Sequence, residues 1–235
     1  MKVINLDKEI FEQACSLCKA EFSEEQILEV LKSGTDVEKQ IAILKIDNIA
    51  SKELVQMLVD HLTGQDGPIR EVSAIKLNEL LKYKNCTFFD DEKFYSVYVN
   101  AVCDVNPNVS RTVIDFLTVL KNQVTLLSIL IEKIENIYSR IENPDIEQKN
   151  FLTVRLFNLY WCLETVGELF ALNIISCDKS KLGSLLEKAL MFNNYTIDEK
   201  VAKIVSLIGI DNFKEEIINK LKSSDNFYVR RYFEG

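Results

Sequence analysis

Residues 66–77 read Asp-Gly-Pro-Ile-Arg-Glu-Val-Ser-Ala-Ile-Lys-Leu, a turn that leads into a helical pattern of apolar residues. Pro68 suits the first turn of that helix, because its missing N–H would have no intrahelical partner there. Similar strings begin at residues 36, 106, 143 and 225. The first β-branched apolar residues of these strings, with one further anchor late in the chain, are 32, 40, 37, 51 and 32 residues apart: Val37, Ile69, Val109, Ile146, Ile197 and Val229. Irregular self-similarity at about 30–50 residues, with two helices per unit, is typical of an α-solenoid.

The composition also favours helices. Only 7 of the 235 residues are glycine and 3 are proline, which disfavours an all-β chain with many turns and excludes a collagen-like one. Hydrophobic residues recur at a period near 3.6 almost throughout. Capping patterns predict several helix starts, at Ser23–Gln26, Thr35–Glu38 and Thr196–Glu199. Glycines predict several helix ends, at Gly34, Gly64 and Gly209.

The sequence therefore predicts an all-α protein with more than about 65% helix. We expect a right-handed α-solenoid of about six two-helix repeats. A single domain would span residues 1–235, with an N-terminal capping helix at about 8–20 and repeats at about 23–235. The longest expected helix contains Gly167, which would weaken or break it. The expected helices lie at about 8–20, 23–33, 36–49, 52–63, 68–84, 91–103, 107–121, 125–141, 145–173, 179–192, 197–208, 212–222 and 226–234.

These strings resemble the HEAT-repeat family, whose signature is a turn with Asp and Pro followed by Val-Arg at the start of the second helix. The best match is formed by Asp66, Pro68, Ile69, Arg70, Ala74 and Leu77. Residues 225–230 match the start of a last unit, and residues 106–109 match in part. Glu38 and Asp198 depart from the pattern, because the family often has arginine there. The resemblance implies a curved stack of helix pairs with an extended binding face, usually for protein.

The resemblance also suggests a role for three arginines near the starts of second helices. In HEAT-like stacks such arginines commonly pair with the aspartate of the turn. Here the arginines are Arg70, Arg111 and Arg230, and the acids would be Asp66, Asp104 and Asp225. Recognition of a phosphate or a carboxylate is the alternative role.

The charge and the N-terminus restrict the class of partner. With 36 acidic and 28 basic residues, the net charge is −8, which disfavours nucleic-acid binding. Asp7 and Glu9 interrupt the apolar run that a signal peptide would need, and no uncharged run is long enough to cross a membrane. We therefore expect a cytoplasmic protein that has no membrane partner and whose six cysteines are reduced.

Metal or catalytic sites are not predicted. Cys15 and Cys18 form a lone CxxC without a second pair, and we interpret them as core or half-buried helix positions. His61 is the single histidine, and no partner residues for a catalytic triad accompany it. The sequence thus predicts no cofactor, no metal and no catalytic residue.

Candidate binding residues are those that lie between the core positions of the second helices. On the long helix, Trp161 shares a mixed face with Val154, Asn158, Thr165 and Glu168, where it would either anchor a partner or fill a gap against a neighbouring repeat. The full candidate set is Glu71, Asn78, Glu79, Lys82, Ser110, Asp115, Asn158, Trp161, Thr165 and Glu168. This polar, mildly acidic surface favours a protein or peptide with basic groups and an apolar contact for Trp161.

We therefore expect a non-enzymatic protein-interaction scaffold or adaptor. The alternative is a HEAT-like enzyme, similar to the alkylpurine DNA glycosylases or the bilin lyases. A glycosylase would need a basic concave face with aromatic residues and an acid, and Trp161, Arg155 and Glu164 could fill those roles. The net charge of −8 and the lack of a second tryptophan argue against it.

Overall fold

The computed structural model describes residues 11–12, 14–49, 51–84, 86–142, 151–172, 175 and 177–234. Within these ranges 78% of the residues are helical and none lies in a strand, so the prediction of an all-α protein is confirmed. No helix in the described ranges is both long and apolar enough to cross a bilayer. The expected capping helix at about 8–20 is described only in part, and residues 11–12 and 14–19 are helical.

The chain divides into two compact units. The first unit comprises Met1–Val97 and Asn106–Phe116, and the second comprises Tyr98–Val105 and Leu117–Gly235. We describe each unit by itself. The expectation of a single repeat domain remains a prediction.

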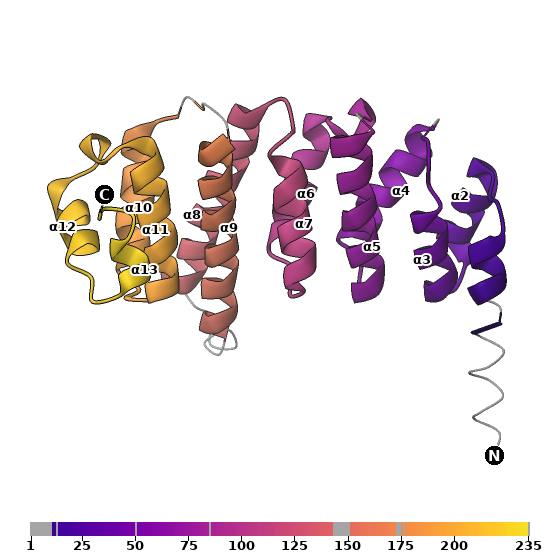
Figure 1. Cartoon of the computed structure of the whole chain (residues 1–235), viewed down its shortest axis with the longest axis horizontal. Helices are drawn as coiled ribbons and strands as arrows, with labels where there is room; N and C mark the ends of the chain where they lie inside the picture. Colours follow the sequence, from indigo (N-terminus) through magenta and orange to yellow (C-terminus); the bar gives the residue numbers. More distant parts are fainter. Residues whose placement is uncertain are drawn as a thin grey trace, which may run out of the picture. The chain divides into compact units, whose positions relative to one another are not determined.

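The first unit is built from helix pairs. α2 packs on α3 and α4 packs on α5, while α2 also contacts α4 and α3 also contacts α5 (Figure 1, indigo to purple). First helices thus contact first helices, and second helices contact second helices. The elements are α2 (Glu24–Ser33), α3 (Asp36–Leu44), α4 (Lys52–Leu62), α5 (Gly67–Asn78), the π-helical η1 (Glu79–Tyr83), the 3-10 turns η2 (Thr87–Phe89) and η3 (Glu92–Phe94), and α7 (Pro107–Leu117). α6 (Tyr95–Val102) begins in the first unit, but its residues from Tyr98 onward belong to the second.

The second unit repeats this mode of packing. α8 packs on α9 and α10 on α11, α8 also contacts α10, and α11 contacts both α9 and α13. α9 contacts both α8 and α11, and its contact with α11 is the more extensive, so α9 is covered on two sides. The elements are α8 (Gln123–Glu142), α9 (Leu152–Leu172), α10 (Lys179–Leu190), α11 (Tyr195–Ile208), the 3-10 turn η5 (Ile210–Asn212), α12 (Glu215–Lys222) and α13 (Phe227–Arg230).

Most of the predicted capping patterns are confirmed. Ser23 and Thr35 each accept a hydrogen bond from the backbone N–H three residues later and form complete capping boxes. Gly209 ends α11 with a φ of 98°, a conformation that favours glycine. Gly34 has an ordinary φ of −70°, but a Cβ there would lie 2.7 Å from the Val30 carbonyl oxygen. Close approach of the backbone is therefore what requires glycine at Gly34.

Two expectations about helix limits are wrong. α11 begins at Tyr195, because the Asn194 side chain accepts from the Thr196 backbone N–H and takes the capping role assigned to Thr196. α9 continues through Gly167 without a break. The missing side chain leaves room there for Lys203, whose Cδ and Cε would each lie 3.3 Å from a Cβ. Residues 143–150, including Pro144 and the anchor Ile146, lie outside the described ranges.

The arginines near the turns contact backbone carbonyls. Arg70 donates from Nη1 to the carbonyls of Gly64 and Gln65, at 3.0 and 2.8 Å. Asp66 accepts from the Ile69 backbone N–H, as a helix cap. Arg230 donates likewise to the Ser224 carbonyl at 2.6 Å and pairs with Glu234. The expected role in holding the turns is thus seen for Arg70 and Arg230, through backbone carbonyls.

Candidate functional site

Three of the expected binding residues of the first unit meet between α5–η1 and α7. The Asp115 carboxylate accepts from Asn78 Nδ2 at 2.9 Å and from Lys82 Nζ at 2.6 Å. Partial burial raises the pKa of Asp115, but these two hydrogen bonds outweigh it and the pKa is lowered. Ser110, which was expected on the same surface, is fully buried in α7 and is not accessible to a partner.

The two glutamates expected on this surface are also engaged within the chain. Glu71 accepts from the side-chain amides of Asn106 at 2.7 Å and Asn108 at 3.1 Å. Glu79 pairs with Lys76 at 2.7 Å and with Lys84 at 3.0 Å, and the hydrogen bond from Lys76 lowers the pKa of Glu79. The acidic side chains on which the expectation of a basic partner rested therefore hold α5 and η1 to their neighbours.

Of the two roles expected for Trp161, the structure favours the one in which it fills a gap within the chain. Only 5% of the residue is exposed, and its ring packs edge-on against Phe157 and Tyr160, with centroids 6.0 and 5.1 Å away. Thr165 is also buried and donates to the Trp161 carbonyl at 2.8 Å. Because α9 is covered by both α8 and α11, its second face is packed too. Neither Trp161 nor Thr165 is accessible to a partner.

Glu168 belongs to an ion-pair cluster between α9 and α11. It accepts from Lys203 at 2.6 Å, and Glu164 lies 3.0 Å from Lys200 and 3.5 Å from Lys203. Burial lowers the pKa of Lys200, but the Glu164 partner outweighs it, so the pKa is raised. The cluster pairs Glu164 and Glu168 with lysines of α11 at the helix interface.

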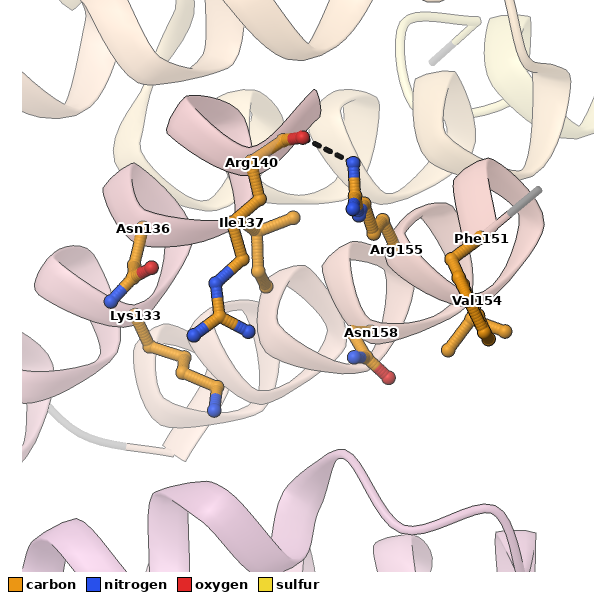
Figure 2. Close-up of a pocket in the computed structure, with 8 residues that line it drawn as sticks. All are labelled: Lys133, Asn136, Ile137, Arg140, Phe151, Val154, Arg155 and Asn158. Carbon is orange, nitrogen blue, oxygen red and sulfur yellow. Dashed lines mark hydrogen bonds between the residues drawn. The ribbon is translucent and has the colours of Figure 1, made fainter. Parts of the chain in front are cut away.

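Asn158 lies elsewhere, in a pocket of about 340 Å³ between α8 and α9. Four residues of α8 face Phe151, which directly precedes α9, and three residues in the first turns of α9, as Figure 2 shows. They contribute three cations, two amides and three apolar side chains, and no carboxylate. The lining residues are Lys133, Asn136, Ile137, Arg140, Phe151, Val154, Arg155 and Asn158.

Each wall of this pocket follows the same helical spacing. The α8 residues are at positions i, i+3, i+4 and i+7 from Lys133, and the residues of the other wall repeat that spacing from Phe151, which directly precedes α9. Residues at these intervals share one face of a helix. This spacing can be read from the sequence. Each row of four residues, however, mixes charged and apolar side chains, so it resembles neither the apolar face of a core helix nor the polar face of a surface helix.

The cations of the pocket are held in different ways. Arg155 is buried and donates to the Arg140 carbonyl near the C-terminal end of α8, where a cation is favoured. Lys133 is half-buried and donates from Nζ to Asn100 Oδ1 at 2.7 Å. Arg140 and Asn136 are exposed. In Figure 2 the guanidinium of Arg155 points to the end of α8, whereas the ends of Arg140, Lys133 and Asn158 lie on the opposite side of the opening.

Two cysteine thiols lie close to each other and to the backbone of Asn158. The sulfur atoms of Cys103 and Cys162 are 3.6 Å apart, and Cys103 Sγ lies 3.8 Å from the Asn158 carbonyl oxygen. The contact with Cys162 lowers the pKa of the Cys103 thiol, while the same contact and full burial raise the pKa of Cys162. Cys15 and Cys18 are both exposed, so their interpretation as core or half-buried positions is wrong. In the part of the chain that the structure describes, no cluster of three or more His, Cys, Asp or Glu could hold a metal ion.

No protein-family model matches the chain, and no curated protein matches it. The resemblance to the HEAT-repeat family therefore remains a prediction from the repeated strings.

Proposed function

We propose that the chain is a non-enzymatic protein-interaction module that binds a peptide segment of its partner in the pocket between α8 and α9. The pocket is the observation that carries this proposal. Phe151 and Val154 form an apolar wall and are 52% and 47% exposed. Lys133 and Arg140 form a cationic wall beside them. An apolar contact next to a few charged groups suits a peptide with an apolar and an acidic side chain.

The architecture that we propose for the module is a HEAT-like α-solenoid in the cytoplasm. Its support is the helix pairing inside each unit, where first helices contact first helices and second helices contact second helices. Stacking of this kind exposes long rows of helix surface, which solenoids use for binding proteins.

We propose an acidic segment in the partner, in place of the basic one expected from the sequence. Glu71, Glu79, Asp115 and Glu168 are all engaged by cations or amides of this chain. A basic partner would have to displace those intramolecular contacts. The pocket, by contrast, already has cations at its opening.

Selection from a random peptide library on the immobilised full chain tests this proposal. We expect the enriched peptides to combine an aromatic or aliphatic residue with nearby acidic residues. Synthetic versions should bind the wild-type chain, and Phe151→Ser should weaken their binding by about tenfold, as removal of an interface anchor does.

Met191→Ser is the matched control, because Met191 is apolar and 73% exposed but does not line the pocket. It should leave peptide binding unchanged. A selection that enriches no peptide, or peptides that bind Phe151→Ser as well as the wild type, would refute the proposal.

A further inference from the structure

We propose that the acidic group bound in the pocket between α8 and α9 is the phosphate of a phosphorylated serine, threonine or tyrosine in the partner. This inference rests on the proposed function, since it names the chemistry of the peptide that the pocket would bind. It is carried by the composition and the placement of the polar groups that line the pocket.

The charge in the pocket is the first argument. Lys133 and Arg140 bring two positive charges to the opening, and among the described residues no carboxylate lines the pocket, in a chain whose net charge is −8. One peptide carboxylate would compensate only one of these two charges. A phosphate monoester carries about −1.5 to −2 at neutral pH and matches them more closely.

The arrangement of donors is the second argument. Arg140 offers a planar fork of N–H donors, which suits two oxygens of one phosphate. Lys133 uses one donor on Asn100 and keeps two others. Figure 2 shows the ends of Arg140 and Lys133 and the amide of Asn158 on the same side of the opening. Three donor groups from two helices thus lie on one side of the opening, and a phosphate has three acceptor oxygens to receive them.

Arg155 contributes differently. Its guanidinium is buried and donates to the Arg140 carbonyl at the end of α8. It therefore holds the backbone that carries Arg140 and adds positive potential from inside the wall. The apolar wall of Phe151 and Val154 then has room for the residue next to the phosphate, since the pocket holds about 340 Å³.

Oriented peptide pools test the inference with the full chain. Each pool contains nine-residue peptides with random flanks and one fixed central residue: phosphoserine, phosphothreonine, phosphotyrosine, serine or glutamate. The immobilised chain is incubated with each pool at 0.15 M salt, and retained peptides are quantified by mass spectrometry. At least one phosphorylated pool should be retained about tenfold more than the serine and glutamate pools.

Charge-removing variants locate the binding site. Arg140→Gln and Lys133→Gln should each reduce retention of the phosphorylated pool by about tenfold. Lys222→Gln is the matched control, because it removes one charge from an exposed position of the same unit outside the pocket. Circular dichroism should show equal helix content in all variants. Arg140 is exposed, so Arg140→Gln keeps the test valid if Lys133→Gln fails to fold.

The outcomes separate this inference from the proposed function. If the serine and glutamate pools are retained as well as the phosphorylated ones, and Phe151→Ser weakens them all, the peptide-binding function stands and the phosphate inference is wrong. If no pool is retained, both are wrong. If inorganic phosphate at equal concentration displaces the peptides, or vesicles with phosphoinositide bind more tightly than any pool, the pocket recognises phosphate from another source and the phosphopeptide inference is also wrong.

Discussion

Trp161 lies in α9 between rings of its own helix, and only 5% of the residue is exposed. Its indole fills the space where α9 is covered by neighbouring helices, so truncation leaves a cavity. We predict that Trp161→Ala lowers the free energy of unfolding by about 3–5 kcal/mol in urea titrations. Phe151→Ala, directly before the same helix, is the control and should cost less than about 1 kcal/mol, because that ring is exposed. A stable Trp161→Ala variant that has lost only peptide binding would restore the anchor interpretation.

His61 predicts a specific dependence of stability on pH. Burial, followed by the nearby positive charge of Lys39, lowers the pKa of His61, and the opposing effects of a hydrogen bond with the Leu31 backbone and of Asp60 are smaller. An unfolded histidine titrates near about 6.5. Between that pH and the lower pKa of the folded chain, the unfolded state binds more protons, so stability falls as the pH drops. Melting temperatures at pH 7.5 and 5.5 should therefore differ less for His61→Gln than for the wild type. An equal difference would contradict the prediction.

The cysteines differ enough in exposure to be distinguished by labelling. Cys15 and Cys18 are exposed, whereas Cys162 is fully buried and burial raises the pKa of its thiol. Reaction with a thiol reagent should show a fast phase that disappears in the double variant Cys15→Ser, Cys18→Ser. The slowest thiol should be the one lost in Cys162→Ala. All six cysteines are free, so reductant should not change the melting temperature. A fast Cys162 would indicate that the second unit opens readily.

At the scale of the element, the best-predicted features are those that depend on neighbours in sequence. Ser23 and Thr35 could be predicted as helix caps because their hydrogen bonds reach only three residues ahead. The burial of Thr165 could not, because it depends on α11 covering the second face of α9. The pocket was missed for a similar reason, since the Lys133 and Phe151 stripes gain meaning only when α8 faces α9.

The end of α11 gives a prediction for one helix boundary. Gly209 has a φ of 98°, which any other residue would adopt only with strain, and a Cβ there would lie 3.3 Å from Asn212 Nδ2. Gly209→Ala should therefore lower the free energy of unfolding by about 1–3 kcal/mol. Gly64→Ala is the control, because the nearest atom to its Cβ would lie 3.4 Å away, at ordinary contact distance. Equal stability of the two variants in urea would mean that the turn after α11 relaxes without cost.

For the whole molecule, the net charge and the local charge of the pocket together favour a peptide partner over duplex DNA. The chain carries −8, yet the pocket between α8 and α9 gathers three cations in about 340 Å³. A pocket of that size can surround one phosphate of a peptide. Duplex DNA presents a row of phosphates and is held by many cations along an extended surface. At long range the net negative charge repels such a polyanion, even though the local potential of the pocket attracts a single group.

We therefore predict that a 20-base-pair duplex has no measurable affinity for the full chain at 0.15 M salt in fluorescence anisotropy. About two phosphate contacts, from Lys133 and Arg140, would give any low-salt binding a shallow salt dependence, with a log–log slope of about −1.8. The same duplex should fail to compete with peptides selected on the pocket. Micromolar binding at 0.15 M salt that Arg140→Gln and Lys133→Gln weaken, while Lys222→Gln does not, would mean that the cations belong to a nucleic-acid interface. The glycosylase-like alternative would then have to be tested by base-excision assays.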